Sequence, residues 1–71
     1  MGQTTEVAVE IIGETSRAFK VADGSVIEWL PKSQILEAYA DGKELDVKRV
    51  RIGQTVTLTL PEWLAGLKGF I

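Results

Sequence analysis

Turn-forming residues divide this chain into short segments, and this constrains its fold more than any other feature. The turn signals are Gly13, Asp23-Gly24-Ser25, Pro31, Asp41-Gly42-Lys43-Glu44 and Gly53-Gln54. Gly and Asp accept the positive φ angles of tight turns, and Pro cannot donate a hydrogen bond to a β-ladder. Between the turns polar and apolar residues alternate, most clearly in residues 6–12 and 55–60, which is typical of half-buried strands. We therefore expect a mainly β protein whose first strand ends at Gly13.

The loop Asp23-Gly24-Ser25 predicts a hairpin between the segments that flank it. A two-residue turn would place Phe19 opposite Glu28. A three-residue loop instead pairs Phe19 with Trp29 and Lys20 with Glu28, which puts the aromatic rings on one face and an ion pair on the other. We therefore predict the three-residue loop.

A second hairpin is expected around a four-residue loop at 41–44. Its strands would cover residues 35–40 and 45–50. This register places Glu37 opposite Lys48, which is a favourable cross-strand pair.

Residues 55–60 alternate without interruption and predict the clearest strand of the chain. Pro61 suits the first position of a helix, and Gly69 suits its left-handed cap. We expect a short helix that docks on the sheet through an apolar stripe at helical spacing. The stripe consists of Trp63, Leu64 and Leu67.

The chain has 71 residues and no Cys. A domain of this size buries only about 60% of the surface that its unfolded chain exposes, and without disulfides its stability has to come from packing or association. We expect a single domain over residues 1–71, with about five antiparallel strands in a small SH3-like or OB-like barrel and one short C-terminal helix. Trp29 and Trp63 are expected mostly inside the core, because each can bury a large apolar area.

Composition disfavours several classes of function. His is absent, so the chain lacks the usual acid/base group at neutral pH and the most common neutral metal ligand. Lys32 and Ser33 are neighbours, but no third group is present to orient a nucleophile and its base. We therefore predict a protein that is not an enzyme and has no catalytic residues, cofactor or metal. Ten acidic and eight basic residues give a net charge of -2, which disfavours nucleic-acid binding.

Two places are candidate interaction surfaces. The corner Lys32-Ser33-Gln34 joins a cation, a hydroxyl and an amide. It forms either a polar recognition cluster or a turn capped by the Ser33 hydroxyl, with Lys32 solvated. Phe70 and Ile71 either close the mouth of the barrel or stay exposed as an apolar patch for another subunit.

Lys48, Arg49 and Arg51 form the main concentration of basic residues. On a strand, Arg49 and Arg51 would point to the same side. Together with Tyr39 they could bind single-stranded nucleic acid, whose bases stack on aromatic rings while cations contact the phosphates. The alternative is a solvated face that is balanced by acidic neighbours.

Glu6, Glu10 and Glu14 form a row of carboxylates along the first predicted strand. Such a row could imitate the phosphate spacing of nucleic acid and occupy a nucleic-acid-binding protein. The alternative is the solvated side of an edge strand, where charge discourages aggregation.

Two blocks carry a resemblance: Trp29-Leu30-Pro31-Lys32-Ser33-Gln34-Ile35 and Pro61-Glu62-Trp63-Leu64-Ala65. With the Asp-Gly hairpin and the closing Lys68-Gly69-Phe70-Ile71, they make the chain resemble small proteins of unknown function encoded by bacteriophages and prophages. The resemblance covers residues 7–71 and implies a phage or prophage origin and the cytoplasm of a bacterial host. The lack of a signal peptide and of a long apolar stretch agrees with this location.

These observations predict a non-enzymatic phage or prophage binding module that acts through protein–protein interaction on a host factor or defence system, alone or as a small homo-oligomer. Its candidate contacts are Lys32, Ser33, Gln34, Phe70 and Ile71. One alternative is an accessory single-stranded nucleic-acid-binding protein of replication or recombination, with Tyr39, Lys48, Arg49 and Arg51 as contacts. Another is a sponge for a small nucleotide signal, held between subunits near Lys32 and Ser33.

Overall fold

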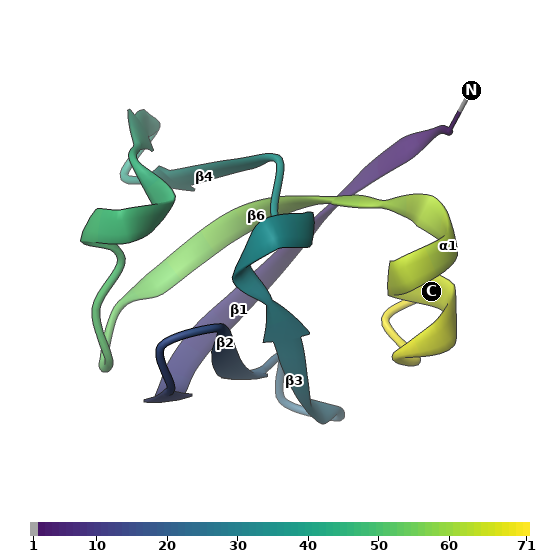
Figure 1. The fold of residues 1–71 in the computed structure, drawn as a ribbon, viewed down its shortest axis with the longest axis horizontal. Coiled ribbons are helices and arrows are strands. Elements are labelled where there is room, and N and C mark those ends of the chain that lie inside the picture. Colours follow the sequence, from purple (N-terminus) through teal and green to yellow (C-terminus); the bar gives the residue numbers. More distant parts are fainter. Residues whose placement is uncertain (1) are drawn as a thin grey trace.

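The computed structural model describes residues 2–71 and shows one antiparallel sheet followed by a short helix (Figure 1). The strands are β1 (Thr4–Glu14), β2 (Ala18–Ala22), β3 (Ile27–Pro31), β4 (Glu37–Ala40), β5 (Lys43–Leu45) and β6 (Thr55–Pro61). Two single-turn 3-10 helices, η1 (Lys32–Gln34) and η2 (Val47–Arg49), and the helix α1 (Glu62–Leu67) complete the chain. The predicted mainly β class with one short helix is confirmed, with six strands rather than about five.

The strands follow the order β3-β2-β1-β6-β4-β5, so β1 and β6 form the centre of the sheet. Figure 1 shows these two long strands running together through the middle of the molecule, with α1 at the end of β6. Over residues 2–71 the edge strands β3 and β5 do not pair with each other. The sheet is therefore open, and the prediction of a barrel holds only as an approximation.

One face of the sheet forms the core. Alternate residues of β1 and β6 pair across the centre, as Val7 with Leu58 and Val9 with Val56, and all four are buried. Phe19 of β2 is fully buried on the same side. Removing this apolar surface from water is the main force that holds so small a domain together.

The first strand does not end at Gly13, as predicted, but continues to Glu14 through a β-bulge. Ile11 pairs with Val21 and Gly13 pairs with Lys20, so Ile12 is the extra residue. A Cβ atom at Gly13 would lie 3.1 Å from the Cβ of Lys20. Glycine at this position therefore lets the strands approach after the bulge, where a side chain would be crowded.

The register of the first hairpin differs from the prediction by one residue. Ala22 pairs with Ile27, which leaves a four-residue loop, and Phe19 faces Leu30 instead of Trp29. The carboxylate of Asp23 holds this loop, because its Oδ1 accepts hydrogen bonds from the backbone nitrogens of residues 25 and 26 at 2.8 and 2.7 Å. The predicted pairing of aromatic rings is wrong because the buried partner of Phe19 is aliphatic.

Trp29 consequently lies on the outer face and is 41% exposed, so its predicted place in the core is wrong. Its ring is 3.7 Å from the position that a Cβ of Gly13 would take. The amino group of Lys20 lies 5.9 Å from the centre of the same ring. The tryptophan thus covers the backbone beside the bulge rather than filling the core.

The second hairpin is shorter than predicted. Ala40 pairs with Lys43 across a two-residue turn, and Asp41 and Gly42 have φ angles of 52° and 76°, as a type I′ turn requires. The second strand ends at Leu45 and is followed by η2, so the predicted pairing of Glu37 with Lys48 does not form. Asp46 ends the strand, because its side chain accepts a hydrogen bond from the backbone nitrogen of Lys48 at 2.9 Å.

The predicted helix is confirmed, but its buried side is not the predicted stripe. Pro61 precedes the helix, and Leu64 and Ala65 are the buried residues of α1. Trp63 is 59% exposed and Leu67 is 72% exposed. The predicted burial of Trp63 is therefore wrong: the sheet covers only one side of this six-residue helix.

Gly69 ends the helix in the predicted left-handed conformation, with a φ of 87°. The backbone nitrogen of Phe70 donates to the carbonyl oxygen of Ala65 at 2.8 Å, and that of Gly69 donates to Gly66 at 3.2 Å, which together form a Schellman motif. This turn brings Phe70 against the core, where its ring is half-buried.

Candidate functional site

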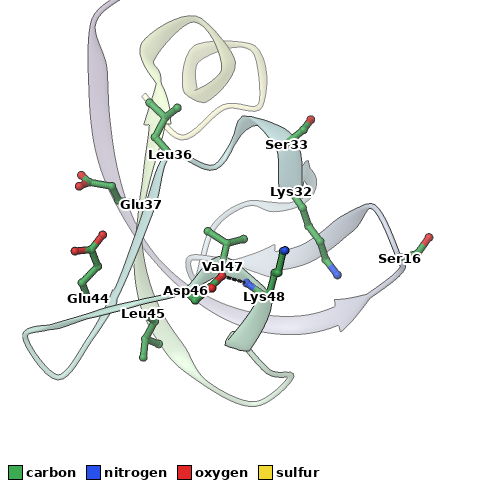
Figure 2. Close-up of a pocket in the computed structure, with 10 residues that line it drawn as sticks. All are labelled: Ser16, Lys32, Ser33, Leu36, Glu37, Glu44, Leu45, Asp46, Val47 and Lys48. Atoms are coloured by element: carbon green, nitrogen blue, oxygen red, sulfur yellow. Dashed lines mark hydrogen bonds between the residues drawn. The ribbon is translucent and has the colours of Figure 1, made fainter.

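A groove of about 600 Å³ lies between the two 3-10 helices. Figure 2 shows Leu36, Glu37 and Glu44 on one side of the groove, and Lys32, Ser33 and Ser16 on the other. The groove therefore contains the polar corner that the sequence indicated. Its charges are mixed in sign, since carboxylates and amines line it together.

Lys32 is held within the fold rather than presented to a ligand. Its Nζ lies 2.6 Å from Oε2 of Glu14 and 4.7 Å from the centre of the Phe19 ring. The β-bulge carries the strand on to Glu14, which makes this ion pair possible. A cation with both a carboxylate and an aromatic ring as neighbours has little free capacity to recognise a further anion. Ser33 is exposed and Gln34 is half-buried.

The basic residues do not lie on one strand, contrary to the prediction. Arg49 is exposed at the end of η2. The guanidinium of Arg51 donates hydrogen bonds to the carbonyl oxygens of Lys48 and Val50 at 3.0 and 3.3 Å, so it supports the loop that follows η2. Gln54 supports the same loop, because its side-chain oxygen accepts a hydrogen bond from the backbone nitrogen of Arg51 at 2.8 Å.

Tyr39 lies on the outer face of the sheet among acidic side chains. Desolvation raises the pKa of its hydroxyl, and a hydrogen bond to Glu37 and the charge of that carboxylate raise it further. The negative charges of Glu44 and Glu6 act in the same direction. The carboxylates around this ring repel phosphate groups. They therefore weaken the prediction of a nucleic-acid surface centred on Tyr39.

Exposed apolar side chains form a second kind of candidate site, of which the sequence predicted only Ile71. They are Ile12, Ile27, Trp29, Leu36, Ile52, Trp63, Leu67 and Ile71. Ile27 and Trp29 alternate along the outer face of the edge strand β3. Trp63 and Leu67 lie four residues apart on α1 and share one side of it. Their helical spacing predicts a stripe that faces the core, whereas the structure leaves both side chains exposed.

The end of α1 lies near β3, but on the face of that strand opposite to Ile27 and Trp29. The amino group of Lys68, directly after α1, lies 3.9 Å from Oε2 of Glu28 on β3. A Cβ at Gly69 would lie 3.9 Å from a methyl group of Val26. Ile71 is 65% exposed, whereas Phe70 packs against the core, so the two residues that were expected to act together are separated.

In the part of the chain that the structure describes, no group of three or more His, Cys, Asp or Glu side chains is arranged to hold a metal ion. No helix among the same residues has the length and apolar character needed to cross a membrane.

Comparison with known proteins gives no match: no protein family model fits the chain, and neither the curated proteins nor the solved structures contain a significant relative.

Proposed function

We propose that this protein is a non-enzymatic binding module that acts through contact with another protein. The observation that carries the proposal is the exposure of three large apolar side chains at the C-terminal helix, which are Trp63 at 59%, Leu67 at 72% and Ile71 at 65%. Large apolar side chains that gather on a surface mark interaction sites. Tryptophan is also among the residues that contribute most to binding energy at protein interfaces.

This surface is formed by one side of α1 and by the end of the chain. Trp63 and Leu67 are adjacent on one side of α1, and Ile71 follows the Schellman turn next to Gly66. We name Trp63, Leu67 and Ile71 the helix surface. Because the core is already closed by Leu64, Ala65 and Phe70, this surface is not needed to complete the fold.

The setting of the partner follows from the resemblance to small phage and prophage proteins. It favours a host factor or a component of a defence system in the bacterial cytoplasm, bound by one copy of the chain or by a small homo-oligomer. At the corner of Lys32, Ser33 and Gln34, the exposed hydroxyl of Ser33 is the group most accessible to a partner, because Lys32 is paired with Glu14.

The proposal is tested with a Trp63→Ala/Leu67→Ala double variant and an Ile52→Ala control, which removes an equally exposed apolar side chain from a loop outside the helix surface. Affinity capture from bacterial lysate, with mass spectrometry, is compared between the three proteins, and light scattering gives the mass of each alone. We expect a specific partner, or self-association, that the double variant loses and the control keeps. A monomer with no specific partner, or equal capture by all three proteins, contradicts the proposal.

The alternative of a sponge for a small nucleotide rests only on the size of the groove at Lys32 and Ser33, about 600 Å³, since Lys32 is paired with Glu14 and carboxylates line the groove. A bound nucleotide raises the free energy of unfolding by about 2.7 kcal/mol when its free concentration is about 100 times its dissociation constant. Thermal-shift measurements with a panel of nucleotides therefore test it. An unchanged melting temperature with every nucleotide excludes this function.

A further inference from the structure

The two edges of the sheet differ in how well they are protected against pairing with another strand. At one edge, β5 has three residues, and two of them, Lys43 and Glu44, are charged and exposed. At the other edge, β3 has five residues, and its exposed side chains are Ile27 and Trp29. Short strands and charged side chains keep natural sheet edges from pairing, whereas a longer apolar edge favours it. A further strand is therefore expected to add to the sheet at β3.

The hydrogen-bond pattern shows which backbone groups of β3 point toward this edge. The backbone nitrogen of Lys32 donates to the carbonyl oxygen of Arg17 at 2.8 Å, in the register of the β2–β3 ladder. Hydrogen-bonded and non-hydrogen-bonded pairs alternate along an antiparallel ladder. Counted back from Lys32, the N–H and C=O groups of Ile27 and Trp29 therefore point away from β2, toward the outer side of the edge strand.

These backbone groups are open to a partner. Among residues 2–71, Ile27 and Trp29 have no backbone hydrogen bond to a loop or a further strand on that side. The ring of Trp29 lies back over β2, 3.7 Å from the position that a Cβ of Gly13 would take, so it does not cover the edge. Pro31 is the next residue whose backbone faces outward, and its missing N–H costs the ladder with β2 no hydrogen bond.

We propose that the β3 edge pairs with the β3 edge of a second copy of this chain, antiparallel and about a two-fold axis at Glu28. In this register Ile27 of one copy and Trp29 of the other exchange both of their N–H···O bonds, and the symmetric pair does the same. An axis at Trp29 would instead place the C=O of Ile27 opposite Pro31, which has no hydrogen to donate. The axis at Glu28 therefore satisfies both edges.

The side chains that meet in this register are also compatible. On the outer face, Ile27 of each copy lies beside Trp29 of the other, so apolar surface is covered twice. On the inner face, the two Glu28 side chains meet at the axis. Each Glu28 brings its own cation, because Nζ of Lys68 lies 3.9 Å from its Oε2. The two ion pairs then lie side by side, and their opposite charges offset the repulsion between the carboxylates.

A second copy fits this edge better than a foreign strand does, because the edge is complementary to itself in donors, acceptors and charge. The assembly also closes. Pairing uses both β3 edges and joins two six-stranded sheets into one continuous sheet, whose remaining edges are the short and charged β5 strands. An isologous contact of this kind ends at two copies and does not continue into a fibre.

This inference goes beyond the proposed function, since the β3 edge is separate from the helix surface. The Trp63→Ala/Leu67→Ala variant is expected to form the dimer as the parent protein does. Loss of its partner from lysate would leave the dimer intact, so the two proposals fail separately.

The first test is sedimentation equilibrium of the parent protein and of two charge variants over a range of concentrations. Ile27→Glu is expected to raise the dissociation constant of the dimer at least about tenfold, because it places a charge on the paired edge and removes the contact with Trp29. Ile52→Glu is the matched control, since Ile52 is 59% exposed and Ile27 is 61% exposed. It is expected to change the dissociation constant by less than about twofold.

The second test reads the register and does not depend on the folding of Ile27→Glu. The chain has no Cys, so a single introduced Cys can form a disulfide only between copies. Glu28→Cys places two thiols opposite each other in a non-hydrogen-bonded pair, where the Cα atoms lie about 4.5 Å apart, within the range for a disulfide. With oxidised glutathione it is expected to cross-link at least about ten times faster than Ile52→Cys, which relies on random collision. Trp29→Cys faces Ile27 in this register and is expected to cross-link as slowly as the control.

The proposal is overturned if the parent protein stays monomeric at every concentration, including the case in which a strand of another protein occupies the edge. Equal dimerisation of Ile27→Glu and Ile52→Glu also overturns it. So does cross-linking of Glu28→Cys that is no faster than that of Ile52→Cys or Trp29→Cys.

Discussion

The two Asp-Gly hairpins begin with the same dipeptide but form different turns. In the first, Asp23 and Gly24 belong to a four-residue loop between Ala22 and Ile27. In the second, Asp41 and Gly42 alone connect Ala40 to Lys43. Asp41 has a positive φ of 52°, whereas Asp23 instead caps its loop with hydrogen bonds from its side chain.

The difference shows that the dipeptide permits a turn without deciding its length. In the first hairpin the register places Phe19 opposite Leu30, and both are fully buried. In the second hairpin Leu45 is only half-buried, and the strand it belongs to has three residues. We infer that core burial sets the register of the first hairpin, whereas turn geometry sets that of the second.

The largest effect that separates the two hairpins is expected for Leu30→Ala. Leu30 is fully buried, so its truncation should lower the free energy of unfolding by about 2–5 kcal/mol. Leu45→Ala in the second hairpin should cost only about 1 kcal/mol, because Leu45 is half-buried. Urea unfolding of both variants measures the difference. Equal losses would show that the first hairpin does not depend on the core more than the second.

A smaller effect is expected for Gly42→Ala in the two-residue turn. Gly42 has a φ of 76°, and a Cβ there would contact nothing within 4 Å, so the loss comes from backbone conformation alone. We expect a decrease of about 1 kcal/mol in the free energy of unfolding.

Gly24→Ala is the matched variant in the first hairpin, because Gly24 has a φ of 99° and equally open surroundings. The same denaturation experiment should give a similar loss there. A much larger loss at one glycine would mean that the two loops differ in their need for a positive φ, and not only in their length.

The smallest effect is expected for the charge of Asp23, and it depends on pH. Hydrogen bonds from the backbone nitrogens of Ser25 and Val26 lower the pKa of this carboxyl below its ordinary value of 3.8. Because the folded-state pKa is depressed, the ionised carboxylate stabilises the protein above pH 3.8, and this contribution is lost as the pH falls through the folded-state value.

Asp23→Asn should therefore lower the melting temperature slightly at neutral pH and have less effect in strong acid. Asp41→Asn is the matched variant, since Asn also accepts a positive φ and Asp41 has no such capping bonds among the described residues. Melting curves at neutral and acidic pH check both variants. A pH-independent difference between Asp23→Asn and the parent protein would contradict the role of the charge.

Strands in which polar and apolar residues alternate without a break could be predicted from the sequence. The registers in which the strands of the two hairpins pair could not. Residues 55–60 show no break in their pattern, and the structure has β6 at Thr55–Pro61. The predicted register of the first hairpin rests on the ion pair Lys20–Glu28 and the ring pair Phe19–Trp29. Each such cross-strand pair contributes only about 0.2–1 kcal/mol. Burying Leu30 outweighs them, and this preference appears only when the whole core is assembled.

The candidate sites were predictable only in part, because they depend on contacts between distant segments. The polar corner at Lys32 lines a groove, as the sequence suggested. Its ion pair with Glu14 depends on a β-bulge that could not be predicted from the sequence pattern. The same bulge separates Glu14 from the row that begins with Glu6. On the outer face, Glu6 and Glu37 both pair with Thr59, and this neighbourhood can be predicted only when the order of three strands is known.

The pairing of β1 with β6 has a consequence for how the chain folds. These strands lie farthest apart along the sequence, yet they form the centre of the sheet, with β2 and β3 on one side and β4 and β5 on the other. Closing that long loop costs entropy before the central contacts repay it, so we expect folding to be slow for a domain of this size. During synthesis β1 leaves the ribosome well before β6. The edge of β1 that pairs with β6 therefore keeps its backbone hydrogen-bonding groups unpaired until β6 has been made.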